Sequence, residues 1–111
     1  MKMNKYTFKS WHNGAGMYYT FDVEAVNVDE AYEQAYDVVY NTQGVDLDVE
    51  LIDSTALQEW SVTALVKGHT ELTFNVIAYS LDMAEISAVQ YAMENKVLFA
   101  GYIITHEKEV K

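Results

Sequence analysis

An internal repeat restricts the possible folds of this chain more than any other sequence feature. Segment 21–35 recurs with Phe74 in the place of Phe21, and the match covers strand-like and helix-like positions together. The matched residues are Phe21, Val23, Ala25, Asp29, Ala31 and Ala35 in the first copy, and Phe74, Val76, Ala78, Asp82, Ala84 and Ala88 in the second. Alternating apolar residues followed by alanines four apart are typical of a strand that leads into a helix. The repeat therefore predicts two copies of one structural unit.

The first copy is expected to form two strands, a helix and a third strand. Apolar and polar residues alternate in segments 5–12 and 17–26, which places Tyr6, Phe8 and Ser10 on one face of the first segment. The Asn-Gly-Ala-Gly sequence at 13–16 favours a turn between the two segments. Asn27 is the expected N-cap of the helix, with Glu30 completing a capping box, and Gly44 is its expected end. Segment 45–52 alternates apolar residues with carboxylates, which predicts the third strand.

The second copy follows the same order after a short connector at 53–58. Segments 59–66, 70–79 and 97–105 are its expected strands, Ser80 caps a helix over 81–95, and the polar tail 106–111 is expected to fray. A right-handed crossover places the third strand of each β-β-α-β unit parallel to the second, with the first between them. We predict an α+β fold of six strands and two helices, with both helices on one face of antiparallel-rich sheets. We expect the two repeats, 1–53 and 54–111, to share one compact domain.

Negative charge is concentrated in the first copy. The chain has 17 carboxylates, seven lysines and no arginine, and its net charge is −10. Residues 1–53 hold ten of the carboxylates against three lysines. Such a surface attracts basic proteins and disfavours nucleic acid and anionic membranes as direct partners. The candidate partner-binding acids lie on two expected strands and on the first helix: Asp22, Glu24, Glu30, Glu33, Asp37, Asp46, Asp48 and Glu50.

The expected helices carry a second set of candidate contacts. Three tyrosines recur at i, i+4 and i+8 on the first helix: Tyr32, Tyr36 and Tyr40. The matching sector of the second helix holds three apolar residues: Ile86, Val89 and Met93. Matching stripes favour packing of the two helices against each other, and an exposed aromatic partner site is the alternative interpretation.

The outer sheet face of the second copy is expected to be apolar. Alternation places Ile77, Phe99 and Ile103 there, where the first copy carries carboxylates. Large apolar patches are unusual on monomers, so the other unit or a second chain is expected to cover this face. A homodimer would satisfy that requirement.

Catalytic, metal and cofactor motifs are missing from the sequence. Without cysteine there is neither a disulfide framework nor thiolate chemistry. The three histidines, His12, His69 and His106, do not have zinc-ligand spacing, and segment 46–50 lacks the central glycine of a calcium loop. We therefore expect no catalytic residues, no metal and no cofactor. No long apolar run or secretory leader is recognisable, which favours a cytoplasmic location.

The overall character of the chain points to one class of inhibitor. Alternate residues of a strand lie roughly 6.5 to 7 Å apart, so carboxylate rows on strands repeat at about the spacing of phosphates along one nucleic-acid strand. The chain is small, acidic and rich in tyrosine, and it contains no Cys, Pro or Arg. In this overall character the whole chain resembles phage- and mobile-element-encoded inhibitors of host defence, such as anti-CRISPR and anti-restriction proteins. The segment Phe-x-Val-x-Ala-x-[Asn/Ser]-x-Asp is similar to one in many small phage and plasmid proteins.

The carboxylate spacing and the resemblance to inhibitors of host defence together imply a non-enzymatic inhibitor that acts in the host cytoplasm. It would occupy a basic nucleic-acid-binding surface of a host protein or defence complex by mimicking nucleic acid. The alternative is a protein–protein interaction or assembly module. Such a module would work through an apolar sheet or helix face, and its acidity would serve solubility alone.

Overall fold

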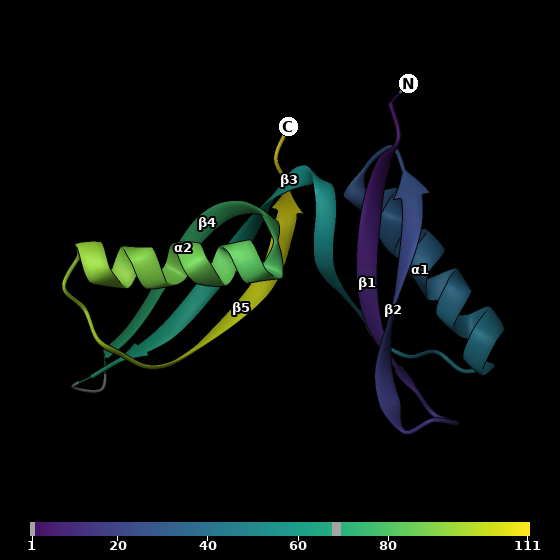
Figure 1. Cartoon of the computed structure of the whole chain (residues 1–111), viewed down its shortest axis with the longest axis horizontal. Coiled ribbons are helices and arrows are strands. Elements are labelled where there is room, and N and C mark those ends of the chain that lie inside the picture. The colour runs from purple at the N-terminus through teal and green to yellow at the C-terminus, as the bar shows by residue number, and fades with distance from the viewer. Residues whose placement is uncertain (1, 68–69) are drawn as a thin grey trace. The chain divides into compact units, whose positions relative to one another are not determined.

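The computed structural model describes residues 2–67 and 70–111, in which five strands and two helices follow one another in the order ββαββαβ (Figure 1). Their bounds are β1 Asn4–His12, β2 Met17–Ala25, α1 Val28–Gln43, β3 Val49–Val66, β4 Thr70–Ser80, α2 Leu81–Glu94 and β5 Phe99–Glu109. The strands form an antiparallel sheet in which β2, β1, β3 and β4 are neighbours in that order and β5 pairs with β3. The α+β class predicted from the sequence is confirmed.

The chain divides into two compact units, Met1–Ala56 and Leu57–Lys111, called unit 1 and unit 2 below. In unit 1, β1 lies between β2 and the first part of β3 and is antiparallel to both. In unit 2, the second part of β3 lies between β4 and β5. The first strand of each unit is therefore the central one, as the crossover rule predicts.

Unit 1 buries one face of its three strands under α1. Tyr6, Phe8 and Ser10 alternate along β1 and are buried, as their spacing predicts. Phe8 lies opposite Phe21 of β2 and Leu51 of β3, so it occupies the middle of the sheet. The residues of α1 that are buried are Val28, Ala31, Ala35 and Val39. Small alanines at two of these positions allow the helix to approach the strands closely.

Unit 2 also packs a helix against three strands, but different residues form its core. Trp60, Val62 and Ala64 of β3 are buried, and the Trp60 Nε1–H donates to the Ala78 carbonyl oxygen of β4 at 3.0 Å. This hydrogen bond offsets the cost of removing the indole N–H from water. The buried residues of α2 are all alanines, namely Ala84, Ala88 and Ala92.

Local capping explains where both helices begin and end. The Asn27 Oδ1 accepts the Glu30 N–H at 2.9 Å, and the Ser80 Oγ accepts the Met83 N–H at 3.1 Å, so both expected N-caps are confirmed. α1 ends at Gly44 with a φ of 74°, a left-handed conformation that favours glycine. After α2 the left-handed position is taken by Lys96, whose φ is 55°.

The prediction of six strands is wrong. Segments 45–52 and 59–66 were expected to be separate strands, but residues 53–58 stay extended and join them into β3. Asp53 lies opposite Thr7 on β1, and Gln58 lies opposite Glu109 on β5, so strand partners are available at both ends of the supposed connector. The connector also holds neither glycine nor proline, hence nothing in it interrupts an extended backbone.

Two further expectations about strand bounds are corrected. β3 begins only at Val49, so Asp46 and Asp48 precede the strand. The tail does not fray from His106, because β5 continues to Glu109 and pairs with β3. The turn expected at Lys67-Gly68-His69 falls on Gly68 and His69, which lie outside the described residues.

Candidate functional site

The solvent face of α1 carries a row of carboxylates. Asp29, Glu33 and Asp37 are exposed and follow one another at i, i+4 and i+8. Because an α-helix rises 1.5 Å per residue, they are about 6 Å apart along its axis. α1 contains no lysine, and within residues 2–67 and 70–111 the ion pairs found are Lys9–Glu50 and Lys108–Glu59. We call Asp29, Glu33 and Asp37 the α1 acidic row.

The predicted tyrosine stripe runs beside the α1 acidic row, and its members have different roles. Tyr36 and Tyr40 are 45% and 54% exposed. Tyr32 is half-buried, and its ring meets that of Phe8 edge to face with centroids 5.0 Å apart. Burial raises the pKa of Tyr32 to about 12. Tyr32 therefore belongs to the packing of unit 1, whereas Tyr36 and Tyr40 are available to a partner.

The remaining predicted acids of α1 and of the segment after it occupy separate places. Glu30 is half-buried and accepts a hydrogen bond from the Gln34 Nε2 at 3.3 Å. Asp46 and Asp48 are exposed in the segment between α1 and β3, where the Ser10 Oγ donates to the Asp48 carbonyl oxygen at 2.9 Å. A strand row of Asp46, Asp48 and Glu50 is therefore not formed, and the strand spacing does not apply to the first two.

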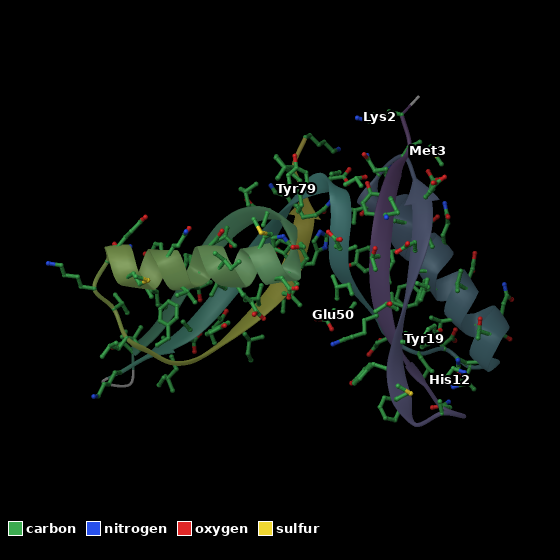
Figure 2. All side chains as sticks on the ribbon, in the orientation of Figure 1. Lys2, Met3, His12, Tyr19, Glu50 and Tyr79 are labelled. Carbon is green, nitrogen blue, oxygen red and sulfur yellow. The ribbon has the colours of Figure 1, made fainter. Side chains whose placement is uncertain are left out.

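The outer sheet face of unit 1 is mixed in charge rather than lined by carboxylates. Glu24 lies opposite Lys5 on β1, and Asp22 accepts a hydrogen bond from the Thr7 Oγ1 at 2.6 Å. Glu50, labelled in Figure 2, pairs with the Lys9 Nζ at 3.5 Å. Two lysines of the central strand thus stand between the acidic residues of its neighbours. This arrangement corrects the expectation of a uniformly acidic sheet face.

The sequence prediction did not assign a role to these two lysines, nor did it include Asp29 among the candidate acids. Lys5 and Lys9 are four apart on β1, so simple alternation already places them on the same face as each other and away from Tyr6 and Phe8. The Lys9 Nζ also lies 4.9 Å from the centroid of the Tyr18 ring. The signal was available in the sequence, but only the strand order β2-β1-β3 shows that these lysines separate two acidic strands.

The three predicted apolar residues of unit 2 do not share one face. Ile77 and Ile103 are exposed on the outer face, with Ile103 opposite Thr63. Phe99 lies opposite the half-buried Val66 and faces inward, where its ring centroid is 6.2 Å from that of Phe74. The placement of Phe99 on the outer face is therefore wrong. The physical reason is a β-bulge that shifts the register between β3 and β5 at Leu65/Val66 and reverses the alternation.

The exposed side of α2 carries an apolar stripe and borders a groove. Ile86, Val89 and Met93 are 53%, 45% and 73% exposed. A groove of about 440 Å³ lies between α2 and β5, with Tyr102 as its lining residue from β5. The sequence prediction did not single out Tyr102, because a tyrosine on a strand has no distinguishing pattern.

The two histidines within the described ranges, His12 and His106, take part in a turn and in packing. The His12 Nδ1 accepts the Ala15 N–H at 3.0 Å and so closes the β1–β2 turn, and its ring lies 5.7 Å from that of Tyr19 (Figure 2). His106 and the buried Gln58 form a hydrogen bond of 2.7 Å between Nε2 and Oε1. Within the described ranges no three His, Asp or Glu side chains are grouped as metal ligands would be. Neither α1 nor α2 is long and apolar enough to cross a bilayer.

Comparison with known proteins gives no relative from which a role could be transferred. No protein-family model, no curated protein and no solved structure matches this chain. Functional inference therefore depends on the surfaces described above.

Proposed function

We propose that this chain is a non-enzymatic acidic binding protein that inhibits a host protein or defence complex by occupying its basic nucleic-acid-binding surface. The contact surface is the solvent face of α1, made by the α1 acidic row together with Tyr36 and Tyr40. The single observation that carries the proposal is that this row has no lysine on its own helix, whereas the carboxylates of the sheet face are interleaved with lysines.

The spacing of the α1 acidic row suits a surface that normally binds phosphates. Its carboxylates repeat every four residues, about 6 Å along the helix axis. That repeat is close to the roughly 6.5 to 7 Å between alternate residues of a strand, on which the mimicry hypothesis was based. In this proposal the carboxylate spacing that mimics phosphates is therefore supplied by α1, and not by a strand row that includes Asp46 and Asp48.

The exposed tyrosines add a second kind of contact to the charge. Tyr36 and Tyr40 lie one turn apart beside Glu33 and Asp37. Surfaces that bind nucleic acid are rich in arginine, whose guanidinium group pairs with carboxylates and stacks on aromatic rings. Tyrosine is also enriched in protein–protein interfaces because it combines a large contact area with a polar end. Carboxylates and tyrosines on one helix face thus match an arginine-lined cleft.

The test is a pull-down at low salt from a lysate of the native host. The bait proteins are the wild type, Asp29→Asn/Glu33→Gln/Asp37→Asn, and a control that neutralises three exposed acids of unit 2, Glu71→Gln/Glu94→Gln/Glu107→Gln. We expect the wild type and the control to capture nucleic-acid-binding proteins that added DNA or RNA releases. Capture by the α1 variant should fall by about tenfold or more, and capture by the wild type should weaken steeply with salt.

Two results contradict this proposal. One is capture that neither added nucleic acid nor salt reduces. The other is an equal loss of capture in the α1 variant and in the control, because general acidity rather than a particular helix face would then explain binding. Circular dichroism checks that both variants keep the helical content of the wild type.

A second candidate function is assembly through the outer sheet face of unit 2. Exposure of Ile103 (69%) and Ile77 (47%) on that face favours it. The substitution Ile103→Asp separates the candidates, since it should abolish a dimer in analytical ultracentrifugation without changing capture by the α1 face. A wild type that sediments as a monomer at all concentrations tested contradicts this candidate.

We also propose that the two units arose by tandem duplication of one ββαβ unit. The repeat at 21–35 and 74–88, the shared element order and the central position of the first strand in each unit support this origin. In such a history the third strand of the first copy and the first strand of the second are now the two parts of β3.

A further inference from the structure

α2 exposes large apolar side chains although it packs against a sheet. Its buried positions hold only alanines, and its larger apolar residues Ile86, Val89 and Met93 point to solvent. These three residues follow at i, i+3 and i+7 and so form one stripe. An exposed apolar stripe is costly unless another surface covers it, and scattered exposure does not explain three neighbours on one helix.

Ile86 and Val89 of this stripe line an open groove to which β5 contributes Tyr102. The α2 residues lining the groove follow at i, i+3, i+4, i+7 and i+8, and Tyr102 completes the lining: Asp82, Glu85, Ile86, Val89, Gln90 and Tyr102. From its first to its last residue on α2 the groove spans about 12 Å along the helix axis. Its volume of about 440 Å³ lies in the range of sites that bind organic side chains and ligands.

The floor and the rim of the groove differ in character. Ile86, Val89 and the Tyr102 ring supply apolar surface, and the rim toward the start of α2 carries Asp82 and Glu85. Among the described residues neither carboxylate has a lysine within ion-pair distance. Residues 2–67 and 70–111 thus leave both carboxylates available to a cation on an incoming segment.

We propose that the groove between α2 and β5 binds a basic amphipathic helix of a partner protein. The apolar side chains of that helix, at i, i+3 or i+4 and i+7, enter the groove along Ile86, Val89 and Tyr102, as in other helix-in-groove complexes. Lysines or arginines flanking them meet Asp82 and Glu85. A second copy of this chain is disfavoured as the occupant, because it brings the same carboxylate rim and a net charge of −10.

This inference does not depend on the proposed function, since the groove belongs to unit 2 and the α1 acidic row to unit 1. The probe is a synthetic peptide of leucine and lysine with leucines at i, i+3, i+4 and i+7. Two control peptides are used: one of the same composition in scrambled order, and one with glutamate in place of lysine. Binding to the full chain is measured by calorimetry and mapped by NMR chemical-shift changes.

The amphipathic basic peptide should bind at least about tenfold more tightly than the scrambled peptide, and the acidic peptide should not bind. Shift changes should be largest in α2 and around Tyr102. The double variant Ile86→Ser/Val89→Ser should lose about tenfold or more in affinity. The variant Ile103→Ser, exposed on the other sheet face of the same unit, should leave affinity unchanged.

A charge-matched pair of variants tests the rim. Asp82→Asn/Glu85→Gln should weaken binding several-fold and reduce its dependence on salt. Glu71→Gln/Glu107→Gln, with the same change of charge outside the groove rim, should bind like the wild type. Equal affinity for the scrambled peptide, or unchanged affinity of the Ile86/Val89 variant, overturns the proposal. A wild-type dimer that Val89→Ser converts to a monomer also overturns it, because a second copy would then be the occupant.

Discussion

α1 and α2 attach to their strands in the same way but present different surfaces to solvent. Ala31 and Ala35 are buried in α1, and the residues 53 positions later, Ala84 and Ala88, are buried in α2. On the exposed sides, Glu33 corresponds to Ile86 and Tyr36 to Val89. The contact with the sheet is thus alike in the two units, while the exposed helix face is acidic and aromatic in unit 1 and carries an apolar stripe beside carboxylates in unit 2.

This difference shows which positions of the two units accept different side chains. An alanine fully buried between a helix and a sheet cannot grow without forcing the layers apart, whereas an exposed position tolerates almost any side chain. The exposed faces are therefore the places where a distinct binding role can evolve without loss of the fold. In this chain the exposed faces differ chiefly in their apolar residues, which are tyrosines on α1 and Ile86, Val89 and Met93 on α2.

The largest expected effect comes from the core that distinguishes unit 2. Trp60→Ala removes a fully buried indole and its hydrogen bond to Ala78, and should destabilise the protein by about 3 to 5 kcal/mol. Urea unfolding gives the magnitude, and amide exchange in β4 and β5 shows whether unit 2 loses protection. A cost below about 1 kcal/mol would mean that Trp60 does not organise this core.

The shared contact between helix and sheet can be tested at equivalent positions. Ala35→Leu in unit 1 and Ala88→Leu in unit 2 each overpack a fully buried site and should cost about 1 to 3 kcal/mol. Thermal and urea unfolding of the two variants are compared with Glu33→Leu, at an exposed position of α1, which should change stability by less than about 0.5 kcal/mol. If one alanine accepts leucine without cost, the helices do not share the same close approach.

Alkaline pH should destabilise unit 1 through Tyr32. Its pKa is raised by burial to about 12, against about 10 in the unfolded chain. The unfolded state therefore releases the phenol proton first, so stability is kept below pH 10 and falls as the pH rises toward 12. After allowance for partial solvent screening, the loss is on the order of 1 kcal/mol. Urea unfolding at pH 9 and pH 11 should show this loss in the wild type and a smaller one in Tyr32→Phe.

The smallest effects are expected at the helix ends, where the units again differ. Gly44→Ala places a side chain at a φ of 74° and should cost about 1 kcal/mol. Lys96→Gly relieves the left-handed conformation at a φ of 55° and should stabilise by at most about 1 kcal/mol, because glycine also gains entropy in the unfolded state. Opposite signs of the two shifts in thermal unfolding are the expected outcome, and equal signs contradict it.

Much of each unit could be predicted from local sequence patterns. The alternation of Tyr6, Phe8 and Ser10 predicted the buried face of β1, and the N-caps Asn27 and Ser80 predicted where the helices begin. These features depend on hydrogen bonds and periodicities within a few residues, which the sequence displays directly. Exposure of seven of the eight predicted carboxylates also followed from their residue type, with Glu30 half-buried.

Pairing between strands could not be predicted in the same way. Residues 53–58 stay extended because β1 pairs with one end of this segment and β5 with the other. No local sequence signal reports such distant strand partners. Phe99 faces inward because a bulge near Val66 reverses the alternation of β5. The carboxylates of the sheet face meet Lys5 and Lys9 because β1 is the central strand of unit 1.

The sequence by itself determined the repeat, the acidic first half and the helix faces, since charge, helical periodicity and caps are properties of neighbouring residues. The tertiary structure decided which acids remain without a lysine beside them and which apolar residues border a groove. Both depend on strand order and register, which bring together residues as distant as Lys9 and Glu50 and fix which face each strand residue occupies.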